Sequence, residues 1–249
     1  MISACPAGAP AGGKMISAVR PRCGNTVCPR EGTVLRMRKK PNLGPRMEAC
    51  SSWLIDAPED IKGRWKEEVT HGLPLHLEIG CGKGRFAVGT AVNEPEHFVV
   101  GLELVPDALV MAMEKAASEN VNNVKFIHGN AIECLSFFDR GEVDRIYLNF
   151  SDPWPSNRHM KRRLTSQNFL EVYKKILSPD GELFQKTDNL PFFEYSLMRF
   201  TKDGWDVSSV TRDLHSTGGG GVMTEYEEKF SSMGAKICRL EARPPKSAE

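Results

Sequence analysis

The length, composition and charge of the chain exclude several classes of protein. It has 249 residues, of which 40% are hydrophobic and 26% are charged. This composition excludes a disordered or fibrous chain and allows one sizeable core. The formal net charge is only +1, so any affinity for nucleic acid has to come from a local basic patch.

No apolar run approaches the roughly 20 residues that a membrane helix needs, and the N-terminus lacks the apolar stretch of a secretory signal. We therefore expect no membrane association and a cytoplasmic location. The seven cysteines are odd in number and scattered, which predicts reduced thiols rather than a disulfide framework. Cys23 and Cys28 have no second Cys/His pair at zinc-ligand spacing, so we expect no metal site.

Residues 1–36 are rich in Gly, Pro and Ala and show no periodicity, and we expect a disordered extension. Within this stretch and just after it, Met15 and Met37 are alternative start positions. Residues 37–55 begin with the basic run RMRKKPNLGPR, which is interrupted by Pro and Gly and predicts a basic N-terminal arm. We expect residues 37–249 to form a single domain.

The elements that follow alternate between strand and helix patterns. Residues 58–69 carry a helical pattern in which Ile61, Trp65 and Val69 recur at i, i+4 and i+8. Strands are then expected at 75–79, 97–103, 124–128, 143–149, 182–186, 205–210 and 235–240, and helices at 86–92, 106–118, 165–177 and 192–202. Residues 178–181, Ser-Pro-Asp-Gly, are expected to stop the third of these helices. This alternation predicts an α/β fold with a mostly parallel, seven-stranded, doubly wound sheet and helices on both faces.

A glycine-rich turn lies where the first strand passes into a helix. It reads Glu78-Ile-Gly80-Cys-Gly82-Lys-Gly84, and glycines allow a sharp turn and close approach to a ligand. Glu103 ends the second strand, where a carboxylate can accept from both ribose hydroxyls. Arg85 stands where a dinucleotide fingerprint needs glycine, and the pattern instead resembles the first motif of Rossmann-like, class I S-adenosylmethionine-dependent methyltransferases. The sulfonium of that cofactor is positive, which suits Glu78. The alternative is a structural turn without a ligand.

Two further strand ends carry polar residues. Asn130 follows the third strand, at a position that commonly recognises the adenine amino group in this fold, although Asn after Gly is also an ordinary turn residue. Asp152 follows the fourth strand in the sequence FSDPWP. In an open α/β sheet this end borders the ligand crevice, so we expect Asp152 near the transferred methyl group and Trp154 as a flat face for a base.

The next six residues, Arg158 to Arg163, include five basic or potentially basic side chains. Such a cluster suits phosphate contacts, and the alternative is a solvated helix start.

FSDPWP followed by RHMKRRL resembles the signature of bacterial-type tRNA (guanine-N7)-methyltransferases. The segments Lys186-Thr-Asp188 and Thr224-Glu-Tyr-Glu227 agree with that family, as does the basic arm, and the resemblance covers about residues 37–243. It implies transfer of a methyl group from S-adenosylmethionine to N7 of a guanine in tRNA, at variable-loop position 46. The FSDPWP form resembles the bacterial branch, so we expect a monomer without the WD-repeat partner of the eukaryotic branch.

The resemblance also implies roles for individual residues. Asp152 is implied as catalytic. The implied cofactor-binding residues are Glu78, Gly80, Gly82, Gly84, Glu103, Asn130 and Asp152. The implied substrate-binding residues are Ser156, Asp188, Thr224, Glu225, Tyr226 and Glu227, and the implied RNA contacts are Arg158, His159, Met160, Lys161, Arg162 and Arg163. Ser156 departs from the family pattern, which usually has Lys there as a substrate contact.

Three other functions remain open from the sequence. Asp152-Pro-Trp-Pro is a permuted likeness of the loop in methyltransferases that act on the amino groups of adenine or cytosine. A small-molecule methyltransferase would leave the basic cluster as a solvated surface. A non-catalytic RNA-binding module would have a degenerate cofactor pocket, although the presence of both Glu78 and Glu103 argues against it.

Overall fold

The computed structural model describes residues 41–219 and 221–246. The predicted extension at 1–36 and the first four residues of the predicted arm lie outside this part of the chain. No helix among the described residues is long and apolar enough to cross a membrane.

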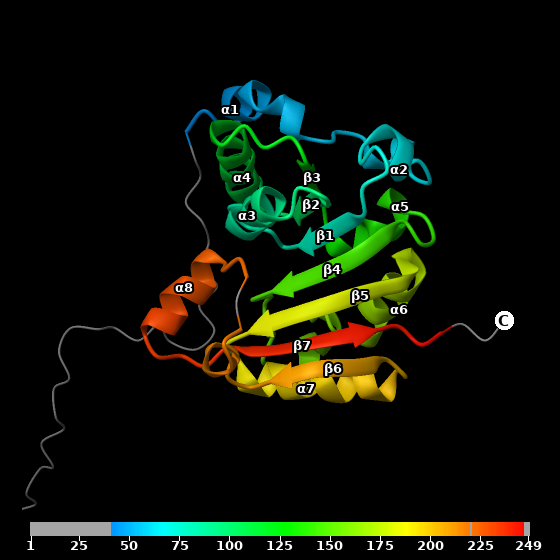
Figure 1. Cartoon of the computed structure of the whole chain (residues 1–249), viewed down its shortest axis with the longest axis vertical. Helices are drawn as coiled ribbons and strands as arrows, with labels where there is room; N and C mark the ends of the chain where they lie inside the picture. Colours follow the sequence, from blue (N-terminus) through cyan, green and yellow to red (C-terminus); the bar gives the residue numbers. More distant parts are fainter. Residues whose placement is uncertain (1–40, 220, 247–249) are drawn as a thin grey trace, which may run out of the picture. The chain divides into compact units, whose positions relative to one another are not determined.

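One sheet organises the described residues, with seven strands in the order β3-β2-β1-β4-β5-β7-β6 (Figure 1). The strands are β1 (Leu75–Ile79), β2 (Phe98–Glu103), β3 (Val124–His128), β4 (Val143–Asn149), β5 (Leu177–Thr187), β6 (Asp206–Thr211) and β7 (Cys238–Arg243). β7 runs antiparallel to β5 and β6, and the other pairs are parallel. The mostly parallel, seven-stranded sheet predicted from the sequence is confirmed. Its strand order reverses direction at β1, and ligands bind beyond the carboxyl ends of the strands at such a point.

Helices cover both faces of the sheet, as predicted. They are α1 (Leu43–Ala49), α2 (Trp65–Glu68), α3 (Arg85–Asn93), α4 (Pro106–Ser118), α5 (Cys134–Phe137), α6 (Gln167–Ile176), α7 (Leu190–Lys202) and α8 (Glu225–Ser232). Short 3-10 helices occupy Ser51–Trp53, Pro58–Ile61, Ala131–Glu133, Asn157–Arg162 and Leu214–Thr217. α3 and α4 pack on β2 and β3, whereas α7 packs on β5, β6 and β7.

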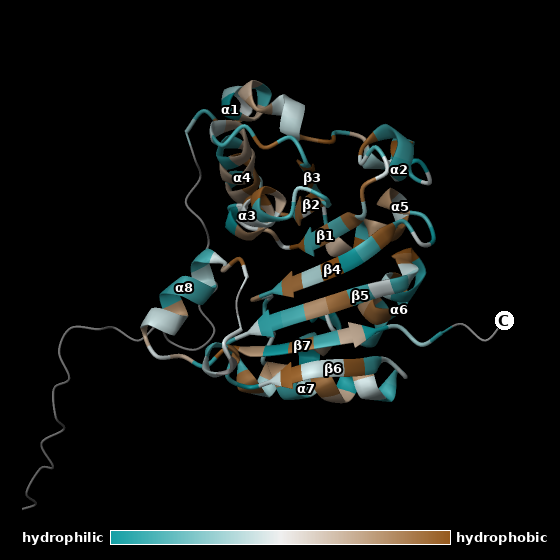
Figure 2. Ribbon diagram, viewed as in Figure 1, coloured by the Kyte–Doolittle hydropathy of each residue, from teal (hydrophilic) through white to brown (hydrophobic). Residues whose placement is uncertain are grey.

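The buried apolar residues form one cluster on each face. Leu77, Ile146 and Leu183 belong to the cluster on the side of α5, α6 and α7, and Val99 and Leu109 belong to the cluster under α3 and α4. In Figure 1 the near face of β4, β5 and β7 is in open view, with α6 and α7 behind it. Figure 2 shows hydrophilic residues among the hydrophobic ones on these strands. The apolar core therefore lies mainly between the sheet and the helices.

The structure refines three local expectations. The predicted arm contains a helix, α1. Arg46 Nε in this helix donates to Glu114 Oε1 on α4 at 2.6 Å. Pro45 lies in the first turn of the helix, where no backbone N–H is needed. The helical pattern at 58–69 gives two short helices, because Gly63 takes a φ of 80° between them. α6 ends at Ile176, as the stop signal at 178–181 predicts, and these four residues lie near the start of β5.

Candidate active site

The glycine turn joins β1 to α3 in left-handed backbone conformations. The φ angles are 80° at Gly80, 56° at Gly82 and 76° at Gly84, in a region that residues other than glycine rarely adopt. A Cβ on Gly84 would lie 2.6 Å from the Cβ of Ala112 on α4, so close helix packing requires glycine there. At Gly80 and Gly82 an added Cβ would meet no atom within 4 Å. The backbone at these two positions therefore borders open space.

Glu78 presents a buried carboxylate at the end of β1. Glu78 is only 2% exposed, and its Oε1 accepts a hydrogen bond from Asn149 Nδ2 at 2.9 Å. Oε2 has no hydrogen-bond partner among the described residues. Burial raises the pKa of Glu78 to about 7, and the hydrogen bond from Asn149 opposes that rise. A buried acceptor of this kind is suited to a cationic ligand, which would supply the missing partner.

Glu103 is held rigidly at the end of β2. Its Oε2 accepts from the backbone N–H of Gly82 and its Oε1 from that of Val105, each at 2.8 Å. The carboxylate thus fixes the glycine turn and still has lone pairs for hydroxyl donors. The open space at Gly80 and Gly82, the orphaned oxygen of Glu78 and this acceptor together fit S-adenosylmethionine.

Asn130 lies at the carboxyl end of the neighbouring strand β3 and is exposed. It caps the short helix Ala131–Glu133, since its Oδ1 accepts from the backbone N–H of Ile132 at 3.2 Å. Its own backbone N–H donates to Glu133 Oε2 at 2.6 Å. The expected turn role is therefore present, and it places the amide group at the same sheet edge as Glu103.

The loop after β4 carries Asp152 on the surface. Phe150 and Trp154 flank this residue with φ angles of 52° and 41°, a conformation that is costly for bulky side chains. The Trp154 ring is in contact with the basic cluster, because the Arg162 guanidinium carbon lies 5.1 Å from the ring centroid. The His159 ring centroid lies 5.8 Å away.

The predicted basic cluster forms the 3-10 helix Asn157–Arg162 and the residue after it. Most of its side chains reach solvent: Arg158, Met160, Lys161 and Arg162 are exposed and His159 is half-buried, and Ser156 just before them is also exposed. Arg163 differs, because it is only 8% exposed and donates to backbone carbonyls of the loop. Its burial conflicts with the predicted RNA contact at this position.

The segment expected to bind substrate forms the start of α8. Thr224 caps this helix, with Oγ1 accepting from the backbone N–H of Glu227 at 2.9 Å. Glu227 is 1% exposed and its Oε2 lies 3.1 Å from Lys186 Nζ at the end of β5. Tyr226 is 60% exposed, and its ring lies nearly parallel to that of Phe150, with centroids 6.5 Å apart. Asp188, two residues beyond Lys186, is exposed.

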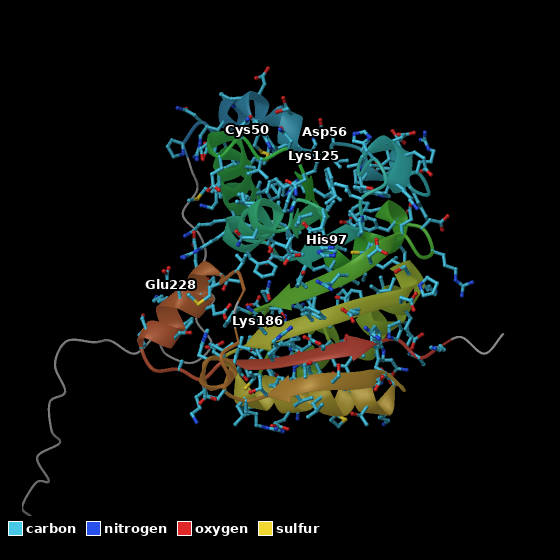
Figure 3. All side chains as sticks on the ribbon, viewed as in Figure 1. Cys50, Asp56, His97, Lys125, Lys186 and Glu228 are labelled. Carbon is cyan, nitrogen blue, oxygen red and sulfur yellow. The ribbon has the colours of Figure 1, made fainter. Side chains whose placement is uncertain are left out.

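Ion pairs dock α8 against the cofactor side of the site. Lys83 Nζ lies 2.8 Å from Glu225 Oε2, and Arg85 pairs with Glu228. Both cations flank Gly84 in the glycine turn. Figure 3 labels Glu228 on α8 and Lys186 across from it. The expected cofactor turn and the expected substrate segment, about 140 residues apart in sequence, are therefore connected directly.

The sequence did not identify four residues that shape this site. They are Lys83, Arg85, Asn149 and Lys186. Asn149 carried the clearest signal, because it ends an otherwise apolar strand at the carboxyl edge. The other three are recognisable only once their carboxylate partners are placed in space.

A doubly wound sheet with a glycine turn after its first strand and acidic residues ending the first two strands defines a Rossmann-like S-adenosylmethionine-dependent methyltransferase. Two solved structures share this fold: an antibiotic-related methyltransferase (TM-score 0.52, 16% identity, 70% of this chain and 89% of that one) and the 16S rRNA (adenine(1408)-N(1))-methyltransferase of Catenulisporales acidiphilia (TM-score 0.52, 16% identity, 77% and 93%). Residues 73–240 match the family model described as a putative methyltransferase.

Closer relatives identify the family within this class. The chain is 48% identical over 214 residues to the tRNA (guanine-N(7)-)-methyltransferase of Geobacillus kaustophilus, a match that covers 85% of this chain and 99% of that protein. It is 44% identical over 209 residues to the enzyme of the same name from Streptococcus uberis, covering 84% and 99%. The chain belongs to the tRNA (guanine-N7)-methyltransferase family.

Proposed function

We propose that the protein transfers the methyl group of S-adenosylmethionine to N7 of a guanine in tRNA, at variable-loop position 46. The observation that carries the proposal is the Glu78 carboxylate, buried at the carboxyl edge with Oε2 unpartnered among the described residues. A buried carboxylate next to a glycine turn can pair with a cation, which suits a sulfonium methyl donor. The family membership specifies the acceptor.

The chain's own groups divide the binding of the donor. The negative charge of Glu78 attracts the positively charged methionine end of the donor, and Glu103 accepts hydrogen bonds from the ribose hydroxyls. Asn130 recognises the adenine, and the backbone of Gly80 and Gly82 allows the close approach of the ligand. S-adenosylmethionine supplies an electrophilic methyl group on a sulfonium sulfur. Positioning of the donor and acceptor then contributes most to catalysis, because the rate of an in-line displacement depends on the alignment of the reacting atoms.

The acceptor atom needs no general base. Guanine N7 has a free lone pair and lies on the major-groove edge, so the N7–carbon bond forms as the sulfur–carbon bond breaks and N7 gives up no proton. The purine ring gains positive charge in this step. Asp188 or Asp152 accepts from guanine N1–H and the exocyclic amine, which orients N7 and stabilises that charge. Thr224, Glu225, Tyr226 and Glu227 border the ring.

The exposed part of the basic cluster contacts the RNA backbone. Arg158, Lys161 and Arg162, with His159 and Met160 beside them, lie next to the Asp152 loop, where cations suit phosphates. Ser156 offers a hydroxyl in place of the usual lysine. The bacterial form of the FSDPWP sequence supports action without a protein partner, and a tRNA substrate supports action in the cytoplasm.

Nucleoside analysis tests this proposal. The full chain is incubated with an unmodified tRNA transcript and methyl-labelled S-adenosylmethionine, and the tRNA is then digested and its nucleosides are separated. We expect the label in N7-methylguanosine. Label in N6-methyladenosine or N4-methylcytidine would instead establish the amino-group alternative, and absence of label in the RNA would contradict the proposed substrate.

A further inference from the structure

The loop that carries Asp152 is strained on both sides of that residue. Phe150 and Trp154 have positive φ angles of 52° and 41°, although neither is glycine, asparagine or aspartate. Such conformations persist only where the surrounding structure holds them, and they cluster at functional sites. Something in the fold therefore has to fix this loop.

The side chain of Arg163 contacts the loop at its strained residue. Arg163 Nε donates to the carbonyl oxygen of Pro153 at 2.9 Å, and Nη2 donates to that of Trp154 at 3.1 Å. These two carbonyls belong to the peptide planes on either side of the Trp154 α-carbon. Because the orientations of those two planes define φ and ψ of Trp154, one planar guanidinium fixes both angles.

Arg163 is itself held in place by the elements behind it. Its guanidinium carbon lies 4.2 Å from the ring centroid of Tyr195 on α7, a distance typical of cation–π contact. Its carbonyl accepts from the backbone N–H of Ser166, which precedes α6, at 2.8 Å. The neighbouring Thr165 Oγ1 lies 2.8 Å from Ser196 Oγ, also on α7. The loop is thus tied through Arg163 to the rigid core.

We propose that Arg163 is a positioning residue that holds the Asp152 loop in its catalytic conformation, rather than a residue that contacts RNA phosphate. It is 8% exposed, while Arg158 and Arg162 of the same basic cluster are exposed. Binding a phosphate would require the guanidinium to leave two carbonyls and an aromatic face. The proposal rests on the proposed function, since Asp152 is catalytic only if that function holds.

The test compares Arg163→Lys with Arg158→Ala. Lysine keeps the charge but lacks the planar fork that bonds two carbonyls at once. For Arg163→Lys we expect kcat to fall about 10- to 100-fold, because a misplaced reacting group costs on this order. Affinity for tRNA and its salt dependence should remain within about twofold of wild type, and hydrogen exchange should rise in peptides covering 150–157. For Arg158→Ala we expect the opposite pattern: weaker tRNA binding, a shallower salt slope and unchanged exchange in the loop.

Two variants of Tyr195 keep the test sound if Arg163→Lys fails to fold. Tyr195→Phe retains the ring face and should leave kcat and loop exchange near wild type, whereas Tyr195→Leu should lower kcat and raise exchange at 150–157. The proposal is overturned if Arg163→Lys weakens tRNA binding with kcat intact, if it leaves loop exchange unchanged, or if Tyr195→Leu matches Tyr195→Phe. Failure of the proposed function would show instead as no N7-methylguanosine with the wild-type protein.

Discussion

The buried carboxylate of Glu78 makes binding of the methyl donor depend on pH. Its pKa is raised to about 7 because the group is buried, with Glu103 adding to the rise and Lys186 opposing it. A neutral carboxyl group cannot attract the positive charge of a sulfonium. At pH 6 about one site in eleven is ionised and at pH 8 about ten in eleven, since each pH unit away from the pKa changes the ratio tenfold. The Kd for S-adenosylmethionine should therefore fall about tenfold from pH 6 to pH 8.

The same shift predicts how the ligand-free protein loses stability. The ordinary pKa of this group is 4.5 and the folded value is about 7, so the unfolded chain releases its proton first. The stability that depends on the proton is present below pH 4.5 and is lost as pH rises through 7. At about 1.4 kcal/mol per pH unit the loss reaches about 3 kcal/mol. Glu78→Gln should remove this loss and bind the donor weakly.

Calorimetric titration of the donor at pH 6, 7 and 8, together with thermal unfolding of the ligand-free protein, measures both effects. Wild type should show the tenfold change in Kd and release of a proton on binding in that range, and Glu78→Gln should show neither. The reasoning is refuted if Glu78→Gln retains the wild-type pH profile. It is also refuted if Glu78→Gln is less stable than wild type at pH 8.

Three other predictions concern catalysis and stability. Asp152→Asn should lower kcat at least about 100-fold and change binding of donor and tRNA less than about threefold, as rapid-quench and filter-binding assays would show. Lys186→Met removes the lysine partner of the buried Glu227 carboxylate and leaves it only His215, whose Nε2 lies 3.5 Å from Oε1, as a basic neighbour among the described residues. Breaking a buried pair typically costs about 3–5 kcal/mol, so proteolysis within α8 should be faster and KM for tRNA higher, whereas exposed Lys229→Met should leave both unchanged. Burial lowers the pKa of His76 to about 3 from 6.5. The contribution of the neutral imidazole to the free energy of unfolding is therefore present above pH 6.5 and is lost as pH falls toward 3, by about 1.4 kcal/mol per pH unit. His76→Leu should show a smaller drop in melting temperature than wild type between pH 7 and pH 5.

Equal kcat in Asp152→Asn and wild type would remove that residue from catalysis. Faster cleavage of α8 in both lysine variants would show that lost charge in general, and not the buried pair, loosens the helix. If His76→Leu and wild type lose the same stability on acidification, the imidazole at position 76 is not responsible for it.

The sequence predicted the sheet because its signals are local. Each strand up to β4 alternates with a helix, and Pro106 marks the start of α4, where proline is favoured. Glu78 and the glycine turn were found for the same reason, since their spacing lies within one strand–turn–helix unit. The start of β7 was placed too early, at residue 235, although within the strand the buried Cys238, Leu240 and Ala242 alternate regularly with polar residues.

The remainder of the site depends on contacts that the sequence does not reveal. The run from Arg158 to Arg163 has nearly uniform chemistry, and only the position of Tyr195 on α7 shows that its last member is buried. Lys186 and Glu227 likewise form a buried pair only because α8 folds back over the end of β5. A charged residue can be solvated or structural with the same local sequence, and burial decides between the two.

Replacement of the acceptor atom tests the central claim most directly. A tRNA carrying 7-deazaguanosine at the target position has C–H in place of N7 and keeps the Watson–Crick edge of the base. The account predicts that this tRNA binds with the same Kd as the unmodified one and accepts no methyl group, while the guanosine form is methylated. Methyl transfer to the 7-deaza substrate would contradict the claim that the lone pair of N7 attacks the donor at the carboxyl edge of the sheet.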